Sequence, residues 1–207
     1  MIDARLRPVL SGTLGRIAAV VDRSWLSPGR LTAAGLTLGL AASAAAAVGW
    51  WWPALVAWLV SRLADGLDGP LARRRGTATA LGGFLDIVAD FTVYGAFVAG
   101  VAVGADGSAT PFLVLLVTYY VNGAALLAYS SIAERLGRER GDERSLHFLG
   151  GWAEGAETIA VHSLFCLLPG FAGPIAWVWA AVVAVTAGQR VAHAVRTLSD
   201  SAWRRTR

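Results

Sequence analysis

Four aspartates lie within a short stretch of an otherwise apolar chain. Asp65 and Asp68 are three residues apart, and Asp86 and Asp90 are four residues apart. On a helix, either spacing places both carboxylates on one face. Close negative charges repel one another unless counter-charges lie among them, and Arg73 supplies only one. Carboxylate oxygens are the ligands that Mg²⁺ and Mn²⁺ prefer, so the stretch predicts a site for two of these divalent cations.

Small residues accompany the aspartates. Gly66, Gly69 and Ala72 recur every three residues in the first segment, and Gly82 and Gly83 begin the second. In a membrane helix, small residues allow a neighbouring backbone or a ligand to come close. The pattern predicts a site that holds metal ions together with a bulky polar guest. Helix packing alone would account for the glycines, but it does not account for four acids.

The composition is that of a membrane protein. Of the 207 residues, 56% are hydrophobic and 15% are charged, whereas soluble domains carry about 25% charged residues. This shortfall argues against a soluble globule, a disordered chain and a nucleic-acid-binding arm, so we expect no nucleic-acid partner. The single cysteine, Cys166, excludes an internal disulfide and a cysteine-based zinc site.

Six segments are apolar and long enough to cross a bilayer, which requires about 20 residues each. We therefore expect an all-α integral membrane protein with a single domain over residues 1–207, in which about residues 31–197 form a six-helix bundle. The aspartates fall in the second and third segments, where each would cost about 2.5–3.5 kcal/mol if it faced lipid. They must therefore face a polar interior. The six segments are residues 31–51, 53–73, 80–103, 110–134, 152–169 and 174–197.

Arginine placement predicts the orientation. The chain has 18 arginines and no lysine. All except Arg62 lie before the first segment, in alternate loops, or near the end of the chain. The positive-inside rule places these regions in the cytoplasm. We expect both termini and the aspartate site to face the cytoplasm, in a multi-pass protein of the inner (plasma) membrane.

Residues 1–29 are expected to form a juxtamembrane helix. Leu6, Leu10, Leu14, Ile17 and Val21 recur at helical spacing, with arginines between them. We favour a helix that lies on the anionic inner leaflet. The alternative is a helix that packs on the bundle.

The aspartate stretch has the form Asp65-x2-Asp68-Gly69-x2-Ala72-Arg73-x8-Gly82-x3-Asp86-x3-Asp90. This pattern resembles the signature of the class I CDP-alcohol phosphotransferase (CDP-alcohol phosphatidyltransferase) family at every fixed position. The resemblance implies metal-dependent transfer of a phosphatidyl or other phospho-alcohol group from a CDP-linked donor, CDP-diacylglycerol in the first instance. The group passes to an alcohol acceptor with release of CMP, in phospholipid biosynthesis. The resemblance also implies a homodimer.

The resemblance assigns roles to individual residues. Asp65, Asp68 and Asp86 would hold the binuclear metal centre, and Asp90 would be the general base and a further metal ligand. Arg73 would bind the donor diphosphate. Residues 27–32 resemble the family's Pro-Asn-x-x-Thr motif, with glycine in place of the usual asparagine. The other residues expected to bind the nucleotide or donor are Gly29, Arg30, Leu31, Thr32, Gly69, Ala72, Thr79 and Gly82.

The acceptor site is less defined. Residues 134–144 form either an anion trap or a solvated cytoplasmic loop. Polar residues of the last two segments either bind acceptor hydroxyls or phosphate, or pair with one another, and Tyr119 and Asn122 are expected to line the cavity. Residues 85–91 lack the Pro and Lys typical of phosphatidylglycerophosphate synthases and the Cys-Asp-Arg of inositol-type enzymes, so the acceptor stays unassigned. The candidate acceptor residues are Arg135, Glu154, Glu157 and Arg190.

Two other functions fit the acids less well. A small cation transporter would use the four aspartates as an ion path, but residues 91–100 offer few polar groups beyond Asp90. An intramembrane aspartyl protease needs only two facing acids.

Overall fold

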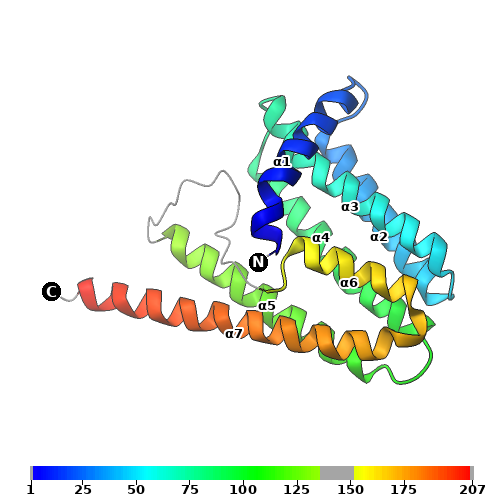
Figure 1. Cartoon of the computed structure of the whole chain (residues 1–207). Coiled ribbons are helices and arrows are strands. Elements are labelled where there is room, and N and C mark those ends of the chain that lie inside the picture. The colour runs from blue at the N-terminus through cyan, green and yellow to red at the C-terminus, as the bar shows by residue number, and fades with distance from the viewer. Residues whose placement is uncertain (1, 136–151, 206–207) are drawn as a thin grey trace.

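The computed structural model describes residues 2–135 and 152–205, with the side chains of residues 12–135 and 152–199. This described part is helical and contains no strand, which confirms the all-α prediction (Figure 1). The elements are α1 (Ile2–Val21), α2 (Pro28–Ala47), α3 (Trp51–Arg74), α4 (Ala80–Gly104), α5 (Thr110–Arg135), α6 (Gly155–Leu167), the 3₁₀ helix η1 (Pro169–Phe171) and α7 (Ala172–Arg205).

Each of the six predicted segments forms a helix, but not all six meet the requirements of a membrane span. Within the described residues, α2, α4, α5 and the segment formed by η1 and α7 are long and apolar enough to cross a bilayer. Helix α3 has 24 residues but carries the charged motif. Helix α6 has 13 residues, or about 20 Å, whereas a bilayer core is about 30 Å thick. The helix ends before Pro169, whose ring and missing N–H prevent its continuation.

Glycines hold α2, α3 and α4 close together. A side chain at Gly35 would meet the Ser61 carbonyl oxygen at 3.3 Å, and one at Gly39 would overlap Val93. In the same way, Gly100 faces the backbone of Ser43. The sequence contains three G-x-x-x-G pairs, and those at 35/39 and 100/104 pack helices within one chain. The pair at 151/155 includes residue 151, which lies outside the described residues.

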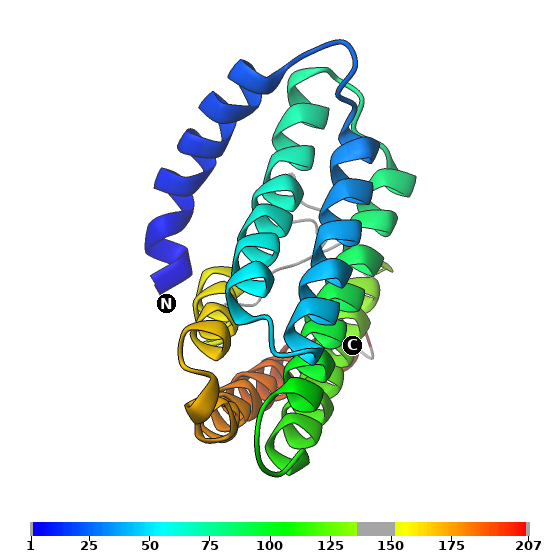
Figure 2. The same ribbon diagram turned by 90° about the vertical axis from the view of Figure 1, so that its right-hand side faces the viewer.

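Helices α5, α6 and α7 form a second group. Helices α5 and α7 run side by side, and α6 packs against both α3 and α7 (Figures 1 and 2). A buried cluster joins the two groups, with Trp58 of α3, Phe97 of α4, Phe112 of α5 and Phe165 of α6 at its centre. The two groups share this one apolar core, so the α3–α4 motif and the α5–α7 helices have fixed relative positions.

Helix α1 packs on α3, which is the alternative that we favoured less. Leu14 and Ile17 contact a buried cluster that includes Leu67 and Leu71 of α3, and Gly66 leaves the space that the Leu14 side chain fills. Contact of α1 with a lipid surface stays a prediction, as does any role for the side chains of residues 1–11.

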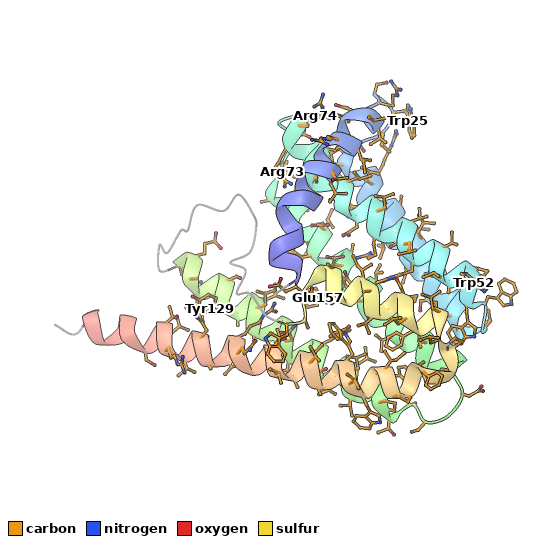
Figure 3. All side chains as sticks on the ribbon, in the orientation of Figure 1. Trp25, Trp52, Arg73, Arg74, Tyr129 and Glu157 are labelled. Carbon is orange, nitrogen blue, oxygen red and sulfur yellow. The ribbon has the colours of Figure 1, made fainter. Side chains whose placement is uncertain are left out.

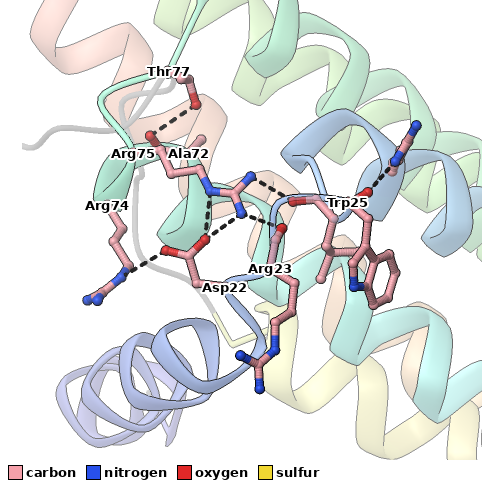
Figure 4. Close-up of polar contacts among 9 residues, drawn as sticks. Asp22, Arg23, Trp25, Ala72, Arg74, Arg75 and Thr77 are labelled. Carbon is pink, nitrogen blue, oxygen red and sulfur yellow. Dashed lines mark hydrogen bonds and ion pairs between the residues drawn. The ribbon is translucent and has the colours of Figure 1, made fainter.

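Ion pairs fasten the end of α1 to the end of α3 (Figure 4). The Arg74 Nε donates to Asp22 at 3.2 Å, and Arg75 donates to Asp22 through Nε and Nη2. Arg75 also donates to the carbonyl oxygens of Arg23 and Leu26. The hydrogen bond from Arg75 is the main cause of a pKa below the ordinary value at Asp22. This clasp fixes the α1–α2 linker against the end of α3.

Tight packing between α2 and α4 gives a stability test. In Gly100→Ala, the new Cβ would overlap the Ser43 backbone, so we expect a loss of about 1–3 kcal/mol of unfolding free energy. The control is Gly188→Ala on α7, where the added Cβ meets open space and better helix propensity predicts a gain of up to about 1 kcal/mol. Thermal unfolding of both variants in detergent measures the difference. Equal midpoints would contradict the close α2–α4 contact.

The Asp22 clasp gives a test by hydrogen exchange. Asp22→Asn removes the charge that Arg74 and Arg75 contact, so amide exchange over residues 12–26 should accelerate at pH 7. Because the pKa of folded Asp22 is lowered, its stabilising contribution is present above the ordinary value of 3.8 and is lost as the pH falls through the lower folded value. Asp106→Asn, in an exposed loop, is the matched control and should leave this exchange unchanged.

Candidate active site

The four motif aspartates lie on α3 and α4, within range of one another's charges. Asp65 lies close enough to Asp86 and Asp90 for their charges to interact, and Asp86 interacts likewise with Asp68. The turn between the helices sets this arrangement. Gly76 has a φ of +63° there, a conformation that residues with a side chain rarely adopt. The structure therefore brings together the acids that the spacing predicted on two helix faces.

A buried arginine is the direct counter-ion of two of these acids. The Arg62 Nη1 lies 2.5 Å from Asp90 Oδ1 and 3.7 Å from Asp65 Oδ2. The guanidinium carbon lies 5.2 Å and 5.0 Å from the ring centres of Trp58 and Tyr94. The motif pattern assigned no role to Arg62. The available signal was its position near the middle of a predicted membrane segment, whereas Arg73 lies at the end of that segment.

A threonine from α2 contacts the third acid. The Thr32 Oγ1 donates to Asp68 Oδ2 at 2.6 Å, and Asp68 is buried. Ser27 begins α2 by accepting a hydrogen bond from the Arg30 backbone N–H, a usual N-cap contact. Among the predicted donor-binding residues at the start of α2, Thr32 is the one that hydrogen-bonds to an aspartate. Leu31 is buried against α1 and α3, whereas Gly29 and Arg30 are exposed and the Arg30 side chain donates to the Trp25 carbonyl oxygen.

The other predicted donor residues surround the α3–α4 turn. A Cβ at Gly69 would lie 3.3 Å from Arg73 Nη1, so the arginine side chain folds along its own helix. Figure 3 shows Arg73 near the end of α3, on the same side of the molecule as Arg74 and Trp25 and far from Trp52. Thr79 begins α4 by accepting from the Gly82 N–H at 3.1 Å. Ala72 is half-buried on α3.

The acids have the chemistry of a divalent-cation site. Asp65, Asp68, Asp86 and Asp90 present only hard oxygen ligands, which suit Mg²⁺ and Mn²⁺. In the described part of the chain, no three acidic, histidine or cysteine side chains converge as a ready ligand set. The oxygen ligands suit the cations, but the carboxylates do not form a ready ligand set, and Arg62 contacts two of them.

A cavity of about 590 Å³ adjoins Asp90 and extends between the two helix groups. Its walls come from α4, α5, α6 and α7 and are mostly apolar. The structure thus brings two of the four candidate acceptor residues, Glu154 and Arg190, to the same cavity as the candidate base. Arg135 and Glu157 are not among the residues that line it. The polar lining side chains are Asp90, Tyr94, Tyr119, Tyr120, Asn122, Glu154, Thr158 and Arg190.

Arg190 is the buried cation of this cavity. Its side chain is only 4% exposed, and its charge interacts with that of Glu154, as one of the two sequence alternatives expected. The Arg190 Nη1 lies 3.5 Å from the Asn122 carbonyl oxygen. Its Nε is buried without a hydrogen-bond partner among the described residues. A buried cation with an unused donor favours an anionic or hydroxyl-rich guest.

Curated relatives match this chain over nearly its full length. The inner membrane protein YnjF of Escherichia coli is 36% identical over 203 residues, which are 97% of this chain and 98% of the relative. The phosphatidylinositol phosphate synthase of Mycolicibacterium smegmatis is 33% identical over 200 residues, which are 87% of this chain and 82% of that enzyme.

Solved structures share the fold. The phosphatidylinositol phosphate synthase of Mycobacterium tuberculosis, in complex with manganese and citrate, aligns with a TM-score of 0.68 at 26% identity and covers 89% of each chain. The same enzyme with CDP-DAG bound aligns with a TM-score of 0.68 at 24% identity, over 87% of this chain and 92% of that chain. At 24% identity, this second alignment shows only that the two proteins share a fold.

The family model of the CDP-alcohol phosphatidyltransferases matches residues 25–187, which include the complete aspartate motif and the cavity-lining residues up to α7. With a match over most of its length and two relatives above 30% identity, the chain belongs to the CDP-alcohol phosphatidyltransferase family and is a membrane-associated transferase of substituted phosphate groups.

Proposed function

We propose that this protein transfers a phosphatidyl group from CDP-diacylglycerol to an alcohol acceptor and releases CMP, with two divalent cations, Mg²⁺ or Mn²⁺. The observation that supports the proposal is that the charges of the motif aspartates on α3 and α4 interact, and that one of these acids, Asp90, lines a large cavity. The family match supports a CDP-linked donor, and the phosphatidylinositol phosphate synthase structure with manganese, at 26% identity, supports the cations.

The donor would lie across the α3–α4 turn. Asp65, Asp68, Asp86 and Asp90 would hold the cations, which supply positive charge to the diphosphate and to the departing CMP. Arg73 adds a guanidinium that suits phosphate oxygens. Thr32 fixes Asp68 through its hydrogen bond. Gly82 is exposed and Gly69 and Ala72 are half-buried, so these small residues would leave room for the cytidine.

Asp90 would act as general base. It lies beside the other acids and also lines the cavity, so an acceptor hydroxyl in the cavity would reach it. The carboxylate takes the hydroxyl proton, the oxygen forms a bond to the phosphatidyl phosphorus, and the bond from phosphorus to the CMP oxygen breaks. Phosphoryl transfer depends mainly on positioning and charge compensation, which this arrangement offers.

The proposed setting is a six-span domain over residues 1–207, in the inner membrane, with the active site on the cytoplasmic side and two copies per assembly. The support is the arginine distribution, with α3 and α6 completing the six. α3 would cross with its charged face turned to α2 and α4. The cation-transporter alternative is weaker, because Val93, Phe97 and Val101 of α4 are buried in the apolar core beyond Asp90.

The acceptor would occupy the cavity, with Arg190, Asn122 and Glu154 as its polar contacts. A phosphorylated polyol suits the buried Arg190, because a guanidinium binds phosphate oxygens in pairs. The test is a CMP-release screen of purified protein with CDP-diacylglycerol and Mg²⁺ or Mn²⁺ against glycerol 3-phosphate, inositol phosphate, inositol, serine and a lipid alcohol. CMP release with none of these acceptors would contradict the proposed donor or chemistry.

Asp90 gives the first mechanistic prediction. Asp90→Asn keeps the size of the side chain but cannot take a proton, so kcat for CMP release should fall by about 10²–10⁴-fold. Donor binding, measured by retention of labelled CDP-diacylglycerol, should remain. The control is Asp106→Asn, the same change in an exposed loop. Undiminished turnover in Asp90→Asn would exclude Asp90 as base.

Arg190 gives the second prediction. Arg190→Gln removes the buried charge from the cavity, so KM for a phosphorylated acceptor should rise by about tenfold or more, while KM for the donor changes little. The matched control is Arg196→Gln on the exposed surface of α7. An equal rise in KM for donor and acceptor would show that the variant perturbs the whole site.

A further inference from the structure

We propose that Arg62 is a built-in counter-ion of the aspartate site, which positions Asp90 and makes tight binding of the divalent cations depend on the donor. This inference rests on the proposed function. The structural observation is a buried guanidinium shared by one aspartate from each helix, 2.5 Å from Asp90 and 3.7 Å from Asp65.

The burial of Arg62 requires an explanation. An arginine in a membrane segment is costly and persists mainly where it faces a polar interior with partners. Arg62 is 6% exposed, and an arginine does not lose its proton in a protein. Its positive charge is therefore a permanent part of the site.

The guanidinium is held from three helices. Its Nη2 donates to the Ser61 Oγ at 3.0 Å, and Ser61 donates to the Gly35 carbonyl oxygen of α2 at 2.6 Å. The rings of Trp58 and Tyr94 flank it. These contacts give Arg62 one position, and its bond to Asp90 Oδ1 gives that carboxylate one orientation. The second oxygen of Asp90 is then the one left to face the cations and the acceptor proton.

The charges explain why such an arginine would help. The four carboxylates carry four negative charges, and Arg62 and Arg73 carry two positive ones. Two divalent cations would bring the site to a net charge of plus two. The diphosphate of a CDP-linked donor carries two negative charges, so the complex with cations and donor together is neutral. Arg62 repels divalent cations that bind without the donor. The negative charge of the donor diphosphate offsets this repulsion.

The experiment is direct Mn²⁺ binding to purified protein in detergent, followed by the electron paramagnetic resonance signal of free Mn²⁺. Four proteins are compared without nucleotide: wild type, Arg62→Gln, Arg62→Lys, and Arg23→Gln, which removes the same charge from an exposed side chain. Arg62→Gln should bind Mn²⁺ about tenfold more tightly than wild type, because a nearby like charge is gone. Arg62→Lys and Arg23→Gln should remain within about twofold of wild type by the same argument.

Two further readouts complete the test. Addition of CDP-diacylglycerol should tighten Mn²⁺ binding in wild type and should tighten it several-fold less in Arg62→Gln. At saturating Mn²⁺, kcat for CMP release should fall in Arg62→Gln, because Asp90 loses its orientation. If Arg62 only supported the fold, Arg62→Gln would weaken Mn²⁺ binding, because a perturbed site binds metal more weakly.

The outcomes are distinguishable. Unchanged or weaker Mn²⁺ binding by Arg62→Gln overturns the counter-ion role. If Arg62→Gln does not fold, Arg62→Lys decides: wild-type Mn²⁺ affinity with reduced kcat supports the role, and markedly tighter binding overturns it. A wild-type protein that binds no Mn²⁺ and releases no CMP contradicts the proposed function itself. If the wild type is active and Arg62→Gln has the same Mn²⁺ affinity and the same kcat, only the proposal for Arg62 is contradicted.

Discussion

The mutual repulsion of four carboxylates within apolar helices is the constraint on which this structure depends. Isolated from water and from one another, the acids would destabilise α3 and α4. The fold meets this constraint with partners from neighbouring helices. Arg62 contacts Asp65 and Asp90, and Thr32 of α2 contacts Asp68. Since these partners must approach closely, the glycines that allow tight α2–α3–α4 packing belong to the same solution.

The site is therefore a product of helix spacing as much as of acidic residues. Gly35 allows the α3 backbone to approach α2 at Ser61, and Ser61 in turn accepts a hydrogen bond from Arg62. Larger residues at these positions would separate the helices and move the counter-charges away from the acids. The packing glycines and the charged side chains therefore both determine how closely the counter-charges approach the acids.

Local patterns predicted a large part of this arrangement. Apolar segments and helical spacing predicted the seven α-helices of the described residues, and their boundaries depend on nearby residues such as Ser27 and Thr79. The aspartate spacing predicted two carboxylate faces. The pairing of Arg62 with Asp90 was missed because it joins positions on different helices, and sequence spacing does not specify which faces meet. The same limit applies to α1, whose amphipathic pattern fits a lipid surface and a protein surface equally well.

The cavity beside Asp90 has walls from both helix groups, but the motif acids and their counter-ion all belong to α3 and α4, and most of the remaining polar lining belongs to α5, α6 and α7. On the proposed assignment, substitutions at positions such as Asn122 or Arg190 would alter which alcohol the cavity accepts without replacing any residue of the motif. Selectivity and reactivity would then be encoded in separate stretches of the gene, so paralogues could diverge in product while they inherit the same chemistry.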